Sequence, residues 1–193
     1  IIMKITNYIS VLTLSLMITS VSGFAQKSTI NTENSTVEWV GKKIGGQHEG
    51  LINIKDGSLE LNNNQLVGGY FTLDMKSITC TDLEDEGYNK KLVGHLNSDD
   101  FFGVDQFPEA TFEITTATKF VESEASITGM LTIKGKSESI TFDVIRNENI
   151  YTSTINVDRS KFNVRYGSAS FFDSLGDNVI DDIFILDIKL TVN

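Results

Sequence analysis

The chain has 193 residues, a formal net charge of −10 and a single cysteine. An acidic chain disfavours nucleic acid and anionic lipid headgroups as partners, because both attract a positively charged protein surface. One cysteine excludes an internal disulfide, and the length suits one domain with a sizeable core.

Residues 1–25 have the features of a signal peptide. Lys4 supplies a positive charge, and the uncharged run from Tyr8 to Val21 is too short to span a bilayer comfortably. Gly23 and Ala25 are small residues at the positions that a signal peptidase inspects, which predicts cleavage before Gln26. An uncleaved anchor helix is the alternative. We therefore expect a mature domain over residues 26–193, soluble and either periplasmic or secreted.

From Val37 onward, apolar and polar residues alternate with period two, which predicts strands with one buried face. The alternation over residues 37–39 and 52–54 is followed by Asp56-Gly57, a dipeptide typical of a hairpin turn. A further strand is expected over residues 66–75. One of its faces should carry Val67, Gly69, Phe71, Leu73 and Met75.

The second half of the chain continues this pattern. Pro108, which lacks an N–H group, suits the start of a strand over residues 110–114. Lys134-Gly135-Lys136 predicts the turn of another hairpin, and residues 184–192 show the clearest alternation. Together these segments predict an antiparallel sheet of roughly eight strands. Such a sheet, closed into a barrel, has an interior that side chains can fill or that can hold one small ligand.

Two segments interrupt the strands. Tyr88, Leu92, Val93 and Leu96 fall at helical spacing, which predicts a short amphipathic helix before Phe101-Phe102. The segment 158–180 mixes Gly, Ser and Asp with phenylalanines, which indicates a long loop with short turns. A loop of that length in a compact domain is usually functional.

Motifs of the common enzyme classes are missing from the sequence. His48-Glu49 lacks the second histidine that a zinc protease needs at position 52, and the acidic run from Asp82 has Val93 where a calcium loop needs a carboxylate. The sequence contains no G-x-S-x-G elbow, Gly-rich phosphate loop or C-x-x-C pair. We therefore expect no catalytic residue, metal site or cofactor, and a protein that is not an enzyme. Cys80 is expected as a small buried side chain, with pairing between molecules as the alternative.

Five segments stand in an informative order and spacing: Ser35–Trp39, Gly69–Ile78, His95–Phe102, Phe107–Phe112 and Gly129–Gly135. Taken together, they resemble the YceI-like, polyisoprenoid-binding proteins, and the resemblance extends from about Ser35 to Val192. It implies a lipocalin-like antiparallel barrel. With the segments described above, we expect an all-β, eight-stranded barrel of this type with one short helix and a long loop near its mouth.

The resemblance also implies an exported protein that holds a polyisoprenoid, an isoprenoid quinone or a similar amphiphile as carrier or reservoir. Transient membrane contact would serve loading, and a homodimer stays open. His95, Arg159 and Arg165 are the headgroup candidates, with surface salt bridges as the alternative role. The alternative function is a structural or partner-binding barrel with a filled core, and a lipid hydrolase or isomerase is a third hypothesis. The predicted apolar lining consists of Trp39, Phe71, Leu73, Met75, Leu92, Leu96, Phe101, Phe102, Phe112, Leu131, Ile133, Phe142, Phe162, Phe171, Phe172 and Leu186.

Overall fold

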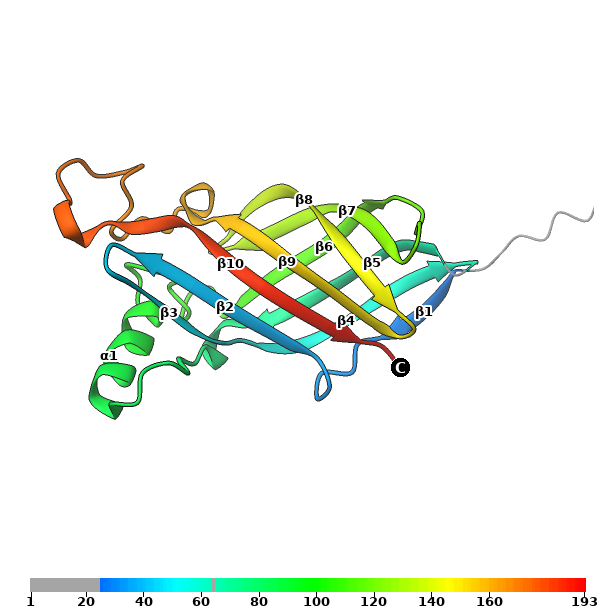
Figure 1. Cartoon of the computed structure of the whole chain (residues 1–193), viewed down its shortest axis with the longest axis horizontal. Coiled ribbons are helices and arrows are strands. Elements are labelled where there is room, and N and C mark those ends of the chain that lie inside the picture. Colours follow the sequence, from blue (N-terminus) through cyan, green and yellow to red (C-terminus); the bar gives the residue numbers. More distant parts are fainter. Residues whose placement is uncertain (1–24, 64) are drawn as a thin grey trace, which may run out of the picture.

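One curled antiparallel sheet of ten strands makes up most of the computed structural model, which describes residues 25–63 and 65–193 (Figure 1). The predicted signal peptide lies, up to Phe24, outside the described residues. The sheet order is β1-β4-β5-β6-β7-β8-β9-β10-β2-β3. The strands are β1 (Gln26–Thr29), β2 (Thr36–Lys43), β3 (Gly46–Leu51), β4 (Asn53–Asn62), β5 (Gln65–Asp74), β6 (Glu109–Ala117), β7 (Glu124–Ile133), β8 (Lys136–Asn147), β9 (Ile150–Asp158) and β10 (Ile180–Thr191).

The sheet has ten strands where roughly eight were expected. β1 pairs with β4, whereas β2 pairs with β3 on one side and β10 on the other. β3 and β4 are separated only by Ile52, whose N–H donates to the carbonyl of Val37 at 3.0 Å. An isolated antiparallel β-bridge joins Ile30, just after β1, to Val192, just after β10, and brings these two parts of the curled sheet together. β1–β2 and β3–β4 thus each serve as one broken strand of the barrel wall.

The inner face of the curled sheet carries the hydrophobic core, as the alternation predicts. Leu186, Ile188 and Leu190 of β10 are buried, and the residues between them are exposed. The Lys134-Gly135 turn is confirmed between β7 and β8, with both residues at positive φ. The mostly apolar interior and the polar exterior follow from this period-two pattern.

The expected face of residues 67–75 is wrong at its first position. Val67 is 48% exposed, whereas Leu66 beside it is buried. The register between β4 and β5 shifts between Glu60 and Leu61, and such a bulge moves every following side chain to the opposite face. Phe71, Leu73 and Met75 do point into the core as predicted.

The predicted turn at Asp56-Gly57 is also wrong. Both residues lie inside β4, where the register shifts between Ile54 and Asp56. A Cβ atom on Gly57 would lie 2.9 Å from the Cβ of Phe71, so glycine serves close packing here and not chain reversal. The reversal falls between β4 and β5 instead, where Asn63 has a φ of 48°.

The short helix and the long loop lie at the same end of the sheet (Figure 1). The helix α1 (Glu86–Asn97) confirms the helical spacing; Asp85 caps it by accepting the N–H of Tyr88 at 2.9 Å. The loop 163–179 lies between the 3-10 turn η2 (Arg159–Phe162) and β10, and contains η3 (Gly176–Asn178). A third 3-10 turn, η1 (Met75–Ser77), follows β5. Among the described residues, no helix has the length and apolar character to cross a membrane.

Candidate functional site

An apolar cavity of about 80 Å³ lies inside the end of the barrel that α1 and the long loop cover. Inward-facing residues of five strands form its wall, among them Trp39, Leu73, Ala110, Leu131 and Leu186. Leu96 of α1 and the adjacent Phe101 and Phe102 close it from the cap. The inward-facing residues of the strands therefore form the wall of the cavity. Leu96, Phe101 and Phe102, together with α1, form what we call the lid.

A second, smaller cavity of about 30 Å³ follows along the same interior. Phe71 and Phe112 line it, each two residues along its strand from a residue of the first cavity, Leu73 and Ala110 respectively. The ring of Phe112 lies 5.4 Å from that of Phe71 and 5.2 Å from that of Phe142, between centroids. These three rings pack against one another around the smaller cavity and leave it little free space.

Among the residues that the structure describes, Arg159 is the only cationic one in the lining of the first cavity, and it is 2% exposed. Its guanidinium donates to four backbone carbonyls at 2.8 to 3.0 Å, and Nη2 lies 3.5 Å from a carboxylate oxygen of Asp182. The acceptors are the carbonyls of Val164, Tyr166, Ile180 and Asp181.

This arrangement makes Arg159 an anchor for the long loop. Burial lowers the pKa of Arg159, while the neighbouring Asp182 opposes that shift. An arginine nevertheless stays charged at neutral pH. Since the guanidinium donates to carbonyls on both sides of the loop, the side chain holds both ends of the loop against the barrel. Its guanidinium carbon also lies 5.5 Å from the ring centroid of Phe101, which links the loop to the lid.

A YceI-like domain model matches residues 29–192, almost all of the part that the structure describes. The chain belongs to the YceI-like domain family. Among curated relatives, a UPF0312 protein of Staphylococcus aureus strain USA300 is 39% identical over 94 residues, which cover 42% of this chain and 51% of that protein. The chain thus spans about half the length of the curated relatives it matches.

Solved structures of YceI-like and similar proteins share the fold. BcnA of Burkholderia cenocepacia has a TM-score of 0.68 at 24% identity, covering 85% of this chain and 99% of that one. A polyisoprenoid binding domain from Saccharophagus degradans, described as implicated in plant cell wall breakdown, has a TM-score of 0.58 at 12% identity, covering 86% and 97%. The YceI protein of Campylobacter jejuni has a TM-score of 0.51 at 20% identity, covering 74% and 84%. These identities show the fold alone.

The YceI-like barrel brings twelve of the sixteen predicted lining residues to its two cavities. The three aromatic residues Phe71, Phe112 and Phe142 line the smaller cavity. The larger cavity is lined by Trp39, Leu73, Met75, Leu96, Phe101, Phe102, Leu131, Ile133 and Leu186.

The other four predicted lining residues lie elsewhere. Phe162 is 1% exposed but packs in the core away from both cavities, and Leu92 is half-buried against that core. Phe171 and Phe172 are 38% and 48% exposed. The larger cavity also contains residues that were not predicted, among them Ile78 and Phe184. Phe184 follows the alternation of β10 and could have been found from it; Ile78 lies outside any strand.

The three headgroup candidates have separate surroundings. Arg159 lines the larger cavity, and its N–H groups donate to four backbone carbonyls. The ring of His95 packs edge-on against Tyr166, with 4.2 Å between centroids, and against Phe101. Arg165 lies on the surface and stacks over Phe171 at 4.9 Å. Only Arg159 therefore borders the apolar interior.

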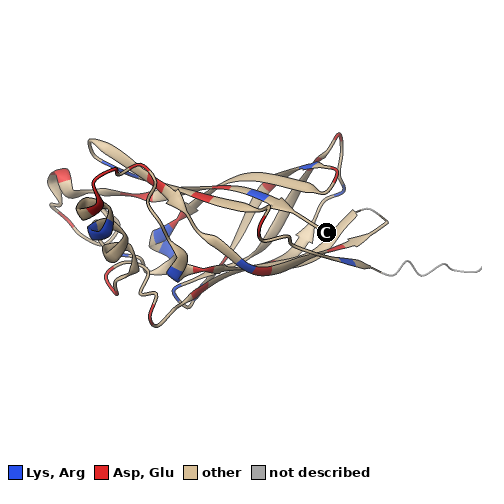
Figure 2. Ribbon diagram, turned by 90° about the horizontal axis from the view of Figure 1, so that it is seen from below, with Lys and Arg blue, Asp and Glu red and all other residues tan. Residues whose placement is uncertain are grey.

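Around the lid, the barrel surface combines exposed aromatic residues with charges. Tyr166 and Phe172 line an open surface hollow together with Arg165 and Lys134. Lys134 donates to the carbonyl of Phe101 at 2.6 Å, so the β7–β8 turn is tied to the lid. Figure 2 shows Lys and Arg interspersed with Asp and Glu along the ribbon. The rim of the capped end is thus amphipathic.

Proposed function

We propose that this YceI-like barrel binds a long apolar ligand in its interior, as a carrier or reservoir. The observation that carries the proposal is the composition of the larger cavity: apart from Arg159, Asp181 and one glycine, every lining residue is hydrophobic. A polyisoprenoid, an isoprenoid quinone or a similar amphiphile fits such a lining, because a buried polar group without a partner costs about 1–3 kcal/mol. The described ligand class of the Saccharophagus degradans domain supports the same choice.

Energetics favours a membrane as the source of the ligand. Transfer of forty carbons out of water, at about 0.8 kcal/mol per carbon, would exceed the ceiling of roughly 20 kcal/mol for real complexes. Transfer from a bilayer into an apolar barrel is close to neutral instead, since both surroundings are apolar. Small differences at the barrel mouth can then decide loading and release.

The cavity volumes set a structural condition on this function. About 80 and 30 Å³ hold only a fragment of such a ligand. Side chains must therefore move when the ligand enters. The lid is the place for this movement, because Phe102 and Phe184 are only half-buried and meet edge to face with 6.4 Å between centroids. An apolar chain could replace these ring contacts without exposing polar groups.

The small volumes also favour the second candidate function, a partner-binding or structural barrel whose interior is simply full. The Phe71, Phe112 and Phe142 cluster would then be ordinary core packing. The two functions differ in one respect that is easily measured. A full barrel releases no lipid on extraction and binds none in titrations.

Membrane contact and export belong to the same proposal. The exposed aromatic residues Tyr166, Phe171 and Phe172, beside Arg165 and Lys134, suit shallow contact with a bilayer during loading. The predicted signal peptide supports a periplasmic or secreted location, and cell fractionation with N-terminal sequencing tests it. A membrane-pelleted protein that retains Tyr8 to Val21 would contradict it. We further propose that the chain has no enzymatic activity, and leave a homodimer open.

Trp39 offers a direct test of binding, because it is the only tryptophan and it lines the larger cavity. We expect saturable quenching of its fluorescence when vesicles containing an isoprenoid quinone are added, and none with quinone-free vesicles. Ala110→Phe should abolish the quenching by filling the cavity from the wall. Equal quenching in both proteins would place the quinone outside the barrel and contradict the proposal.

A further inference from the structure

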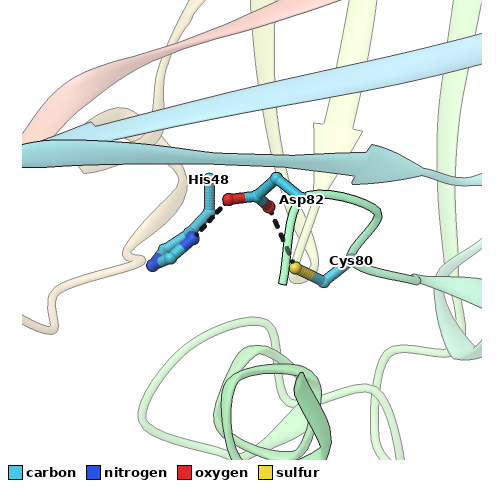
Figure 3. A group of neighbouring side chains, drawn as sticks. All are labelled: His48, Cys80 and Asp82. Carbon is cyan, nitrogen blue, oxygen red and sulfur yellow. Dashed lines mark hydrogen bonds and ion pairs between the residues drawn. The ribbon is translucent and has the colours of Figure 1, made fainter. Parts of the chain in front are cut away.

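Three side chains with metal-binding atoms converge between the edge of β3 and the helix α1 (Figure 3). They are His48 of β3 and, in the segment between η1 and α1, Cys80 and Asp82 (Figure 3). The imidazole Nδ1, the thiol Sγ and a carboxylate oxygen all lie within 4.8 Å of one another. None of the three lines either cavity, so the cluster needs its own explanation.

Backbone pairing explains why these residues meet. β3 is the last strand in the sheet order, and its free edge is covered by an extended segment: Thr79 donates to the carbonyl of Leu51 and Thr81 to that of Glu49, at 3.0 and 2.9 Å. This register sets His48 opposite Asp82, and residue 50 opposite residue 80. Since side chains alternate along extended backbone, all of these positions share one face.

The neighbours of the cluster hold its backbone in place. Gly50, opposite Cys80, lets the two extended segments approach closely, because a Cβ there would collide with the carbonyl of Thr79. From the other side, Asn89 of α1 donates to the carbonyl of Cys80 at 2.9 Å. The sheet edge and the helix thus fix the backbone on which the three ligand atoms stand.

The carboxylate of Asp82 lies between the other two groups. Its Oδ2 is 2.9 Å from Nδ1 of His48, and its Oδ1 accepts from the Cys80 thiol at 3.1 Å and from the Glu49 amide at 3.0 Å. Bond lengths of about 2.0–2.3 Å around a tetrahedral zinc ion place its ligand atoms about 3–4 Å apart. The observed separations need only small side-chain rotations to match this.

We propose that His48, Cys80 and Asp82 form a binding site for a divalent ion of the Zn²⁺ type. Sulfur, nitrogen and oxygen together suit Zn²⁺, whereas Mg²⁺ and Ca²⁺ prefer oxygen ligands alone. Binding forms a bond from the ion to Sγ and releases the thiol proton to solvent. The thiolate and the carboxylate then balance the charge of the ion. Water completes the tetrahedron, because His48 and Asp82 keep 27% and 28% of their side-chain surface exposed.

A nucleophilic role for Cys80 fits the same geometry poorly. Burial, followed by the hydrogen bond to Asp82, raises the pKa of the Cys80 thiol, which keeps it protonated and unreactive. Asp82, and not His48, is the group that accepts from the thiol. A bound metal ion stabilises the thiolate form of Cys80, because the ion replaces the proton as the positive partner of the sulfur atom. The site is independent of the proposed apolar ligand.

Cobalt titration of the purified protein tests the site, because Co²⁺ bound to thiolate has a charge-transfer absorption band. We expect one Co²⁺ per chain, displaced by Zn²⁺ but not by Mg²⁺. Cys80→Ser, which keeps a hydroxyl donor for Asp82, should lose the band. His48→Gln and Asp82→Asn should weaken Zn²⁺ binding at least about 100-fold, since even partners outside the ligand shell typically contribute 10–100-fold.

Asp105→Asn is the matched control, because this carboxylate is 94% exposed and lies outside the cluster. It should bind Zn²⁺ as the parent does. Zn²⁺ should also raise the melting temperature of the parent and of Asp105→Asn, but not of His48→Gln, whose partly exposed position makes folding the least sensitive to change. The absence of a thiolate band with excess Co²⁺, or Zn²⁺ binding that survives in both Cys80→Ser and His48→Gln, would overturn the proposal. The three side chains would then serve only to hydrogen-bond the segment before α1 to β3.

Discussion

The ring of Phe112 occupies the space in which a side chain of residue 129 would lie. A Cβ atom on Gly129 would collide with the edge of this ring, although Gly129 sits in the middle of β7 between Ile114 and Ile140. Glycine is unfavourable inside a strand, so its presence here is explained by the room that it gives to Phe112. The pair therefore sets how far the aromatic cluster fills the barrel.

Gly129→Ala should lower the free energy of unfolding by about 1–3 kcal/mol, the usual range for overpacking a core. Urea denaturation measures this. The control is Gly94→Ala in α1, where no other element of the described structure lies within 4 Å of the added Cβ. This change should be neutral or stabilising by up to about 1 kcal/mol. Equal effects at both positions would refute the tight packing of Phe112 against β7.

Narrowing the interior should reduce ligand occupancy more than stability. Leu73→Trp in the larger cavity and Phe142→Trp in the smaller one add volume to walls that border free space. Overpacking a full core costs about 1–3 kcal/mol, and less where a cavity can take up the side chain. Lipid extracted per mole of protein, compared with the unfolding free energy, separates the two effects. A large stability loss, with no lipid bound to the parent, would favour the filled barrel.

Removal of the Arg159 guanidinium should release the long loop. Arg159→Met leaves four backbone carbonyls without their donor, and each unpaired buried group costs about 1–3 kcal/mol, so the total loss should exceed roughly 3 kcal/mol. Arg165→Met, on the exposed rim, should stay within about 0.5 kcal/mol. Chemical denaturation and hydrogen exchange of residues 163–179 measure both. Unchanged exchange in Arg159→Met would contradict the anchoring role.

Asp182 should make this anchor sensitive to acid. Partial desolvation by itself would raise the pKa of Asp182, but hydrogen bonds from Ser168 and Ser170 and the charge of Arg159 outweigh it and lower the pKa below the usual 3.8. The ionised form is therefore stabilised by folding, and its contribution is complete above the ordinary carboxyl pKa and lost as pH falls through the lowered one. The difference in unfolding free energy between the parent and Asp182→Asn should be constant near neutral pH and shrink below about pH 4. A constant difference down to pH 2 would contradict this coupling.

Local patterns in the sequence predicted most of the barrel. β10 and the Lys134-Gly135 turn follow from alternation and turn chemistry, and α1 follows from helical spacing. The turn predicted at Asp56-Gly57 was wrong, because a glycine needed for close packing is indistinguishable in sequence from a glycine needed for a turn. The prediction that Val67 shares a face with Phe71 was wrong, because a bulge changes the face that a residue occupies and has no local signal in the sequence.

The site was predictable only where it belongs to strands. Lining residues such as Leu73 and Leu186 could be identified because their side chains alternate with exposed ones. The surroundings of Arg159 depend on carbonyls of a loop whose path the sequence does not encode locally. The proposed metal site arises because an irregular segment with Cys80 and Asp82 pairs with the edge of β3, which carries His48. No spacing motif in the sequence predicts this site.

Native mass spectrometry of protein purified without detergent, followed by solvent extraction, tests the central claim most directly. The proposed function predicts a mass excess that matches one single-chain isoprenoid or similar amphiphile per barrel, recovered in the extract and reduced in Leu73→Trp. A protein that carries only its own mass, yields no lipid and remains unloaded after incubation with isoprenoid-containing vesicles would contradict the account and establish a filled barrel.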